Sequence, residues 1–196
     1  IASVLSLGEK LSAALISQKL QLEGKNSNWL CSESLIKTTG NYLNARIDKL
    51  ATEQCFAGLN KDYPRLKITV ITGFSASNKK GQTTLLGRNA SDYSAAIVAK
   101  YTHSESVELF GDTSGILSAD PDYVPGANTI TKLSPSDALQ LAKSGSGVLH
   151  PRTIEPLIGT EIQLQLSDIH NCGSTIISSL IQQREQSYIA TWSPVK

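Results

Sequence analysis

The sequence predicts an α/β fold with a largely parallel sheet, on three observations. Patterns typical of strands and of helices alternate along the 196 residues, as they do in layered α/β proteins. Hydrophobic residues make up 40% and charged residues 18% of the chain, which is a globular composition and excludes a disordered or coiled-coil chain. A chain of this length buries roughly 70% of the surface that its unfolded form exposes, which is enough for a real core.

The first half of the chain predicts two helices, one strand of high β-propensity and a hairpin. Residues 29–31 predict a short strand and residues 49–60 a second helix. Residues 66–72 are rich in β-branched side chains and end at Gly73, so they predict the clearest strand, and residues 74–86 predict a hairpin with its tip at 78–81. A first helix, ending near Gly24, is predicted by one face of apolar residues: Val4, Leu7, Leu11, Leu15 and Leu22.

The second half predicts helices with well-defined starts. Residues 91–103 predict a helix opened by Ser-Asp. Ser134 is placed to cap the next helix, with Pro135 in its first turn and Asp137 near the positive end of its dipole. That helix is expected to run to about Lys143. The remaining elements are a strand at 107–110, a short helix at 151–158 and a strand at 162–166.

Charge and cysteine content narrow the function classes. Eighteen basic and seventeen acidic residues leave a net charge of +1, so nothing favours a nucleic-acid partner. No apolar stretch approaches ~18 residues, so we expect no membrane partner. Cys31, Cys55 and Cys172 are odd in number and far apart. Free thiols in the cytoplasm are therefore expected, rather than disulfides or a zinc site.

The stretch from Gly73 onward carries the densest chemistry. A strand ends at Gly73, and Leu86–Asp92 then reads L-G-R-N-A-S-D and opens a helix. Glycine lets backbone N–H groups approach an anion, and a helix N-terminus adds about half a positive charge. Arg88 supplies a planar fork for a carboxylate or phosphate, and Ser91 can donate to the same anion. The alternative is a helix cap beside a surface arginine.

Several ordered motifs taken together resemble the aspartate kinases of the amino-acid kinase family. Asn89 and the strand E-I-Q-L-Q-L at 161–166 look most like the bifunctional aspartokinase–homoserine dehydrogenases of the methionine-branch type. The motifs are S-L-G-E-K-L-S at 6–12, V-I-T-G-F at 70–74, L-G-R-N-A-S-D-Y-S-A-A at 86–96, G-D-T-S-G-I-L-S-A-D-P at 111–121 and V-L-H-P-R-T-I at 148–154.

The resemblance implies the amino-acid kinase fold, a three-layer α/β/α sandwich with a mainly parallel sheet, incomplete here at its N-terminus. The family opens with a strand and a K-F-G-G loop, which we expect upstream of Ile1. Residues 1–181 would form the C-terminal two-thirds of an aspartokinase catalytic domain, and residues 182–196 a tail or linker. The resemblance also implies a fused homoserine dehydrogenase domain, which would be the only part that uses NADP. It further implies a homo-oligomer.

The implied activity is transfer of the γ-phosphate of ATP to the β-carboxylate of L-aspartate, the first step toward methionine, threonine and lysine. Arg88 would pair with a substrate carboxylate, Glu9 would receive the ammonium, Ser91 would donate to the substrate and Phe74 would wall the site. Arg88 and Asp112 would be the catalytic residues. Mg²⁺ is expected between the phosphates, with no protein ligand assigned. The nucleotide contacts would be Gly73, Gly111, Asp112, Leu117, Asp122, Gly147 and Val148.

Three positions depart from the family pattern. Gly147 stands where the family commonly has lysine, Asp122 where it has the arginine of D-P-R, and Gly111 replaces the threonine of T-D. Losing two cations and gaining an anion weakens polyphosphate binding. We therefore expect the isolated fragment to be inactive. The alternatives are a degenerate, non-catalytic domain with an assembly or regulatory role, or a family member acting on another acidic or phosphorylated substrate.

Other residues have simpler interpretations. His150 is expected to be a structural, hydrogen-bonded histidine, because phosphoryl transfer needs no base there. Asp120, which precedes Pro121, is expected in a turn. Phe110 and Tyr93 are expected in the core.

Overall fold

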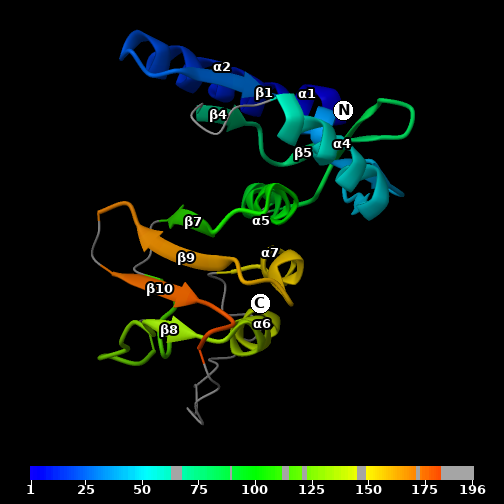
Figure 1. Cartoon of the computed structure of the whole chain (residues 1–196). Coiled ribbons are helices and arrows are strands. Elements are labelled where there is room, and N and C mark those ends of the chain that lie inside the picture. The colour runs from blue at the N-terminus through cyan, green and yellow to red at the C-terminus, as the bar shows by residue number, and fades with distance from the viewer. Residues whose placement is uncertain are drawn as a thin grey trace. The chain divides into compact units, whose positions relative to one another are not determined.

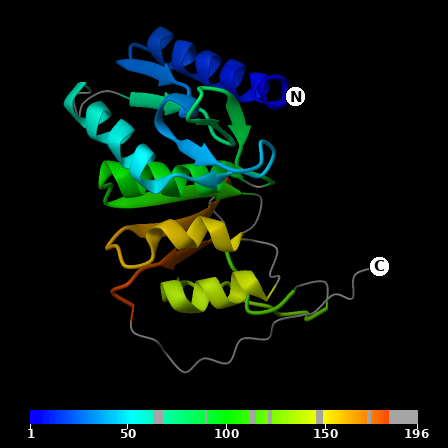
Figure 2. The ribbon, with the colours of Figure 1, turned by 90° about the vertical axis from the view of Figure 1, so that its right-hand side faces the viewer.

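The computed structural model describes residues 1–62, 68–88, 90–111, 115–120, 123–144, 149–170 and 173–181. The chain divides into two compact units between Ala95 and Ala96, inside helix α5 (Ala90–Thr102). Each unit combines helices with its own strands, as Figure 1 and the turned view in Figure 2 show. Among the described residues, no helix is both long and apolar enough to cross a bilayer.

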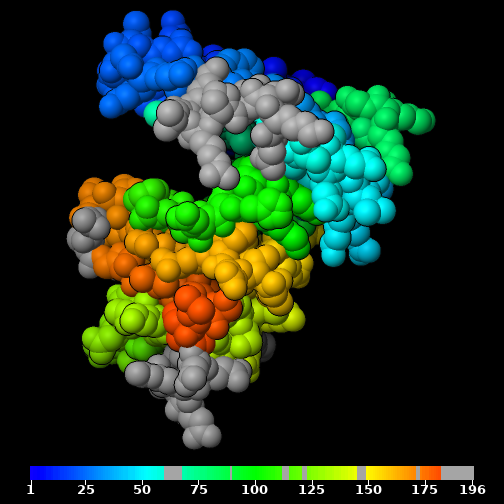
Figure 3. All heavy atoms as spheres, viewed as in Figure 1, coloured from blue at the N-terminus to red at the C-terminus, as the bar shows by residue number. Residues whose placement is uncertain are grey.

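Helices α1 (Ala2–Leu5) and α2 (Leu7–Leu22) confirm the predicted N-terminal helix, with a break at Ser6. Gly24 ends it as expected, because its φ of 75° lets the Lys25 N–H reach the Leu20 carbonyl at 2.9 Å. The apolar face that predicted this helix is 56–79% exposed, and α2 lies at the surface in Figure 3. α2 packs on the strands β1 and β4 of unit 1, and the buried side chains of the two helices and the break are small: Ala2, Ser6, Ala13 and Ser17.

The strands of unit 1 form two parallel pairs in succession. β1 (Ser27–Leu30) pairs with β4 (Ile68–Ile71), and β2 (Lys37–Thr39) pairs with β5 (Ser75–Asn78). β3 (Arg46–Ile47) and β6 (Thr83–Leu85) complete the second sheet, in the order β3-β2-β5-β6. The segment that joins β1 to β2 contains helix α3 (Ser32–Leu35), and the segment that joins β4 to β5 contains residues 72–74. Polar side chains of these two connecting segments contact each other.

The predicted hairpin and second helix of unit 1 are confirmed. β5 and β6 pair antiparallel, and Gly81 at the tip has a φ of 74°. Helix α4 (Lys49–Asp62) follows Asp48, whose Oδ1 accepts a hydrogen bond from the Ala51 N–H at 3.2 Å. This backbone hydrogen bond is the main reason that the pKa of Asp48 is lowered. Phe56 of α4 is 1% exposed and anchors the helix in the core, a burial that stabilises by about 1.5–3 kcal/mol.

Unit 2 is a four-stranded sheet with helices on one face (Figures 1 and 2). Its order is β7 (Ser106–Gly111), β9 (Gln163–Asp168), β10 (Ser174–Ile177) and β8 (Lys132–Leu133), with only β9 and β10 antiparallel. The helices are α6 (Pro135–Lys143) and α7 (Pro151–Ile154), which continues into the 3-10 turn η1 (Glu155–Leu157). The buried apolar residues of these strands and helices include Val107, Leu133, Ile154, Leu157, Leu164, Leu166 and Ile177.

The predicted cap at Ser134 is confirmed, whereas α5 begins at Ala90, so Ser91 lies inside its first turn rather than at its cap. The Ser134 Oγ accepts a hydrogen bond from the Asp137 N–H at 3.2 Å. His150 precedes α7, and its Nδ1 accepts from the Arg152 N–H at 3.1 Å, so this histidine is structural, as expected. Asp120 lies in a turn, with its carbonyl accepting from the Tyr123 N–H.

The core assignment of Phe110 was wrong, because its ring is 65% exposed near the end of β7. The sequence also did not predict the short elements α3, β2, β3, β8 and β10. Each has only two to four residues, too few to show a hydrophobic period. Four of the seven strand pairs among the described residues are parallel, so the sheets are mixed but mostly parallel.

Candidate active site

Residues 72–75, which we call the Gly73 turn, join β4 to β5 and press against the start of α5. A Cβ built on Gly73 would lie 3.1 Å from the Cα, Cβ and Oγ of Ser91. The expectation that this position needs glycine for backbone reasons therefore has a structural basis, the close approach of Ser91. The left-handed conformation falls instead on the next residue, Phe74, with a φ of 64°.

Phe74 is held on both its backbone groups. Its N–H donates to the Oγ of Ser94 at 3.1 Å, and its carbonyl accepts from the Leu86 N–H at 3.0 Å. Ser94 is 3% exposed, and its hydroxyl donates in turn to the Ala90 carbonyl at 2.7 Å. The half-buried phenyl group is thus fixed relative to the first turns of α5.

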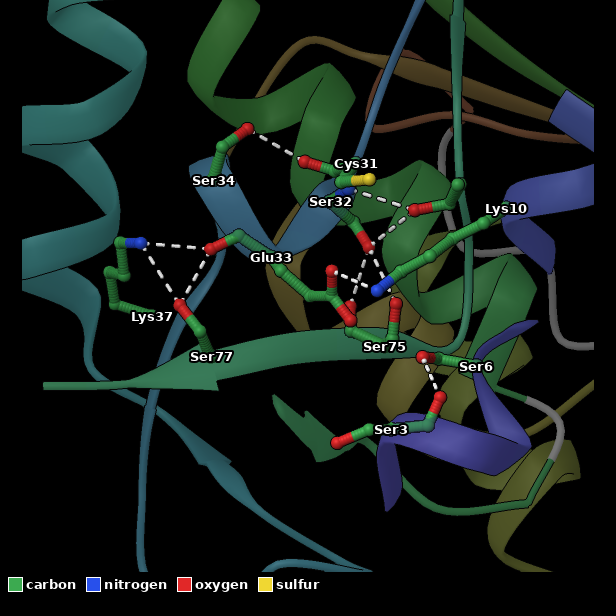
Figure 4. A network of polar contacts seen from close by, with 11 residues as sticks. Ser3, Ser6, Lys10, Cys31, Ser32, Glu33, Ser34, Lys37, Ser75 and Ser77 are labelled. Atoms are coloured by element: carbon green, nitrogen blue, oxygen red, sulfur yellow. Dashed lines mark hydrogen bonds and ion pairs between the residues drawn. The ribbon is translucent and has the colours of Figure 1, made fainter. Parts of the chain in front are cut away.

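A second serine holds the flanks of the Gly73 turn from the other side. Ser32 is fully buried, and its Oγ donates to the Ser75 carbonyl at 2.7 Å and lies 2.9 Å from the Thr72 Oγ1. The Ser32 N–H donates to the same Thr72 oxygen at 2.8 Å. Figure 4 shows Ser32 and Ser75 together with the ion pair of Lys10 and Glu33, whose charged atoms are 2.8 Å apart. These contacts tie α2 and α3 to the Gly73 turn.

The thiol of Cys31 lies beside this network (Figure 4). Burial, with a smaller contribution from the Glu33 carboxylate, raises the pKa of Cys31, and Lys10 partly opposes the shift. The thiol therefore stays protonated at neutral pH and is a poor nucleophile.

The N-terminus of α5 presents two of the predicted substrate groups to solvent. Arg88 and Ser91 are both exposed, and Arg88 has no ion-pair partner among the residues that the structure describes. A free guanidinium beside a helix N-terminus is suited to a carboxylate or a phosphate. Asp92 in the same turn is half-buried, and burial raises its pKa.

Glu9, the predicted ammonium ligand, lies on α2 and is half-buried. Within the described residues its carboxylate has no ion pair, whereas the adjacent Lys10 is already paired with Glu33. Three of the four predicted substrate residues, Phe74, Arg88 and Ser91, thus lie around the start of α5. The fourth, Glu9, lies on α2 and directly precedes Lys10, which the ion pair with Glu33 holds in place.

The predicted nucleotide contacts belong mostly to unit 2, with Gly73 in unit 1. Gly111 is the exposed last residue of β7, and its carbonyl accepts from the Ile169 N–H at 3.2 Å. Leu117 is half-buried and forms an isolated bridge with Thr129. The other predicted contacts lie outside the described residues: Asp112, Asp122, Gly147 and Val148.

The edge beside Gly111 carries exposed apolar side chains. Phe110 is 65% and Ile169 63% exposed, and both lie near the carboxyl ends of the parallel strands β7 and β9. Ligands of α/β proteins commonly bind at this edge, and an exposed aromatic and aliphatic pair fits a nucleotide base. Among the described residues, no three His, Cys, Asp or Glu side chains gather into a metal site.

Thr175 holds the loop that contains Leu117, a role that sequence reasoning missed. Thr175 is fully buried on β10, and its Oγ1 accepts from the Ile116 N–H at 2.8 Å and donates to the Ile130 carbonyl at 2.7 Å. Gly115, with a φ of 89°, lets the loop pass this close. Ser32 and Ser94 were missed in the same way. Only Ser94 carried a signal, since it lies in the quoted S-D-Y-S motif.

Comparisons with known proteins place this geometry in a family. A model of the amino acid kinase family matches residues 1–167. The bifunctional aspartokinase/homoserine dehydrogenase 2 of Escherichia coli K12 is 35% identical over 201 residues, covering 97% of this chain and 24% of that protein. An aspartokinase of Rickettsia prowazekii is 34% identical over 179 residues, covering 89% of this chain and 39% of that protein. Fused and separate aspartokinases thus match at similar identity.

A solved structure confirms the predicted fold class. The crystal structure of E. coli aspartokinase III in complex with aspartate and ADP superposes with a TM-score of 0.83 at 29% identity, over 90% of this chain and 40% of that chain. The α/β fold with mostly parallel, mixed sheets is therefore the one shared with aspartokinases. The chain spans 22% and 39% of the length of the first two curated relatives that it matches.

Proposed function

The chain belongs to the amino acid kinase family, and on that premise we propose that it is part of an aspartate kinase, which transfers the γ-phosphate of ATP to the β-carboxylate of L-aspartate. The observation that carries the proposal is the exposed Arg88, which has no ion-pair partner in the part of the chain that the structure describes and lies at the N-terminus of α5, near Ser91 and the Gly73 turn. The similar aspartokinase III was solved with aspartate and ADP bound, which supports both ligands.

Each substrate residue has a defined task in this proposal. Arg88 forms a charge-assisted pair with a substrate carboxylate, worth about 1.5–3 kcal/mol. Ser91 donates a hydrogen bond to the same substrate, Phe74 forms a wall, and Glu9 receives the ammonium. Phosphoryl transfer depends mainly on positioning and on charge neutralisation, so these fixed contacts are the contribution of unit 1.

ATP fits the exposed edge of unit 2. Gly111 and Leu117 would contact the nucleotide together with Asp112, Asp122, Gly147 and Val148, with Asp112 as a catalytic residue and Gly73 as a further contact. The exposed Phe110 and Ile169 offer apolar surface to the base. Magnesium bound to ATP supplies charge neutralisation between the phosphates. No described residue is assigned to hold it.

The wider context is also part of the proposal. The resemblance favours a chain fused to homoserine dehydrogenase and assembled as a homo-oligomer. A cytoplasmic site of action agrees with the free thiols of Cys31 and Cys55. We expect the isolated 196-residue chain to have no kinase activity, because Gly147 and Asp122 remove two family cations from the nucleotide site.

The same two substitutions favour a second candidate, a non-catalytic kinase-like domain that assembles or regulates a partner domain. A coupled assay of ADP release separates the two, with the intact protein, Mg-ATP and aspartate as the varied substrate. ADP release that saturates with aspartate is expected. Its absence, in a protein that unfolds cooperatively, would overturn the kinase proposal in favour of the non-catalytic one.

A further inference from the structure

Phe74 adopts a backbone conformation that its residue type disfavours. Its φ of 64° lies in the left-handed region, which is uncommon for residues other than glycine and strained for a bulky side chain. Such strain persists only where surrounding contacts impose it, and it concentrates at functional sites. The neighbouring Gly73, which could adopt this conformation freely, does not have a positive φ.

Two contacts hold Phe74 in this conformation. Within the turn, the Ser75 N–H donates to the Gly73 carbonyl at 2.6 Å, across Phe74, and the contact from outside the turn comes from α5. The Phe74 N–H donates to the Ser94 Oγ, and the Ser94 hydroxyl proton is directed to the Ala90 carbonyl one turn earlier. Because the hydroxyl has its own acceptor, its lone pair is available to the amide. Ser94 is 3% exposed, so water is not available to replace it.

Ser94 also links the two halves of the substrate site. Ser91 lies three residues before it, on the same helix, and approaches Gly73 so closely that a Cβ there would be 3.1 Å from its atoms. The Ser94 hydrogen bond and the contact of Gly73 with Ser91 therefore fix the same two segments against each other. If the hydrogen bond between Ser94 and Phe74 were lost, the distance between the Phe74 phenyl group and the Ser91 hydroxyl would no longer be fixed.

We propose that Ser94 is a positioning residue, which holds Phe74 in its left-handed conformation and so sets the geometry in which Phe74 and Ser91 receive the substrate. This inference rests on the proposed function for its kinetic consequence, but the backbone contact itself does not. Serine or threonine can perform the role, since both offer a hydroxyl that bonds back to the helix carbonyl. Alanine cannot.

The test compares Ser94→Ala and Ser94→Thr in the intact protein, with Ser17→Ala as a matched control. Ser17 is also a buried serine in a helix, but its Oγ lies 3.2 Å from the Ser27 Oγ, away from the Gly73 turn. Amide hydrogen exchange, followed by mass spectrometry of peptides that cover residues 70–78, reports the contact directly. Steady-state kinetics report its consequence.

In Ser94→Ala, we expect the Phe74 amide to exchange at least about tenfold faster and the KM for aspartate to rise about ten- to a hundredfold. The KM for ATP should change by less than about twofold, because Ser94 positions only groups that contact aspartate. A variant that was merely destabilised would not show this difference between the two substrates. Ser94→Thr should restore both measurements, and Ser17→Ala should change neither.

Unchanged exchange at Phe74 in Ser94→Ala would overturn the proposal, as would equal effects of Ser94→Ala and Ser17→Ala on the aspartate KM. Absence of any aspartate-dependent ADP release in the wild type would instead defeat the proposed function. In that case the exchange measurement still decides the role of Ser94.

Discussion

Replacing Gly73 by alanine tests whether the contact between the Gly73 turn and α5 shapes the substrate site. The added Cβ would stand 3.1 Å from the Ser91 Cα, Cβ and Oγ. Carbon atoms in contact prefer about 3.5–4.0 Å, so the two segments must separate by roughly half an ångström. One of the three atoms is backbone, which means that a side-chain rotation alone cannot relieve the clash.

The magnitude follows from two opposing contributions. Overpacking costs about 1–3 kcal/mol, while alanine lowers the entropy of the unfolded chain and recovers about 0.4–1 kcal/mol. The net loss of stability should therefore be near 1 kcal/mol. A misplacement of about 1 Å at a reacting group can cost about a hundredfold in rate, so half of that should lower kcat/KM for aspartate about tenfold. Valine, which adds more bulk, should abolish activity.

Coupled ADP-release kinetics and urea unfolding of the intact protein measure both effects. Gly58→Ala is the control, because nothing lies within 4 Å of a Cβ at that position of α4. It should raise stability by up to about 1 kcal/mol through helix propensity and leave the kinetics unchanged. A kcat/KM for aspartate within twofold of wild type in Gly73→Ala would refute the argument, and so would a loss of activity that only matches the loss of folded protein.

Three further predictions concern single contacts. Arg88→Ala should raise the aspartate KM by at least about tenfold with little change in the ATP KM, and an unchanged aspartate KM would remove Arg88 from the site. Burial raises the pKa of Asp92, so the folded state keeps the proton on this carboxyl group to higher pH than the unfolded state does. The stability of the protein therefore falls as the pH rises from 3.8, the ordinary pKa, through the raised pKa of the folded state. The stability of Asp92→Asn relative to wild type, from urea unfolding, should therefore increase across that window and level off above it, and a decrease would mean that the helix dipole outweighs burial. A Cβ on Gly115, which has a φ of 89°, would lie 2.5 Å from the Thr175 Oγ1 and 2.8 Å from the Thr175 backbone nitrogen. Gly115→Ala should therefore destabilise the protein by more than about 3 kcal/mol. A thermal unfolding curve like that of wild type would contradict this prediction.

Local signals predicted most of the helices and strands. The cap at Ser134 was readable because one hydroxyl, one proline and one aspartate act within a single turn, and the structure has the Asp137 N–H on the Ser134 Oγ. The hairpin tip at Gly81 was readable for the same reason, since its positive φ requires a residue type that the sequence displays. Such features can be predicted from the sequence because the interacting residues lie within about four positions of each other.

Hydrogen bonds between residues that are far apart in the sequence could not be predicted. Ser32 contacts residues that are 40 and 43 positions away, and Thr175 contacts one that is 59 away. A serine on a short helix has the same local signature whether its hydroxyl meets water or a buried carbonyl. The exposed leucine face of α2 is the converse case, since its period predicted the helix correctly without determining which side packs on β1 and β4.

The two classes of site residue are therefore under different physical constraints. Arg88 and Ser91 are exposed, and in the proposed function they act through charge and hydrogen bonds to the substrate, so substitutions there are expected to change binding while the fold is kept. Ser32 and Ser94 are buried, and each hydroxyl makes one hydrogen bond as a donor and lies within hydrogen-bond distance of a second partner. Removing either leaves an unpaired backbone group, which costs about 1–3 kcal/mol. A change of substrate can thus arise by substitution at the rim of α5, whereas a buried hydroxyl must persist at Ser32 and at Ser94 for any substrate to be held.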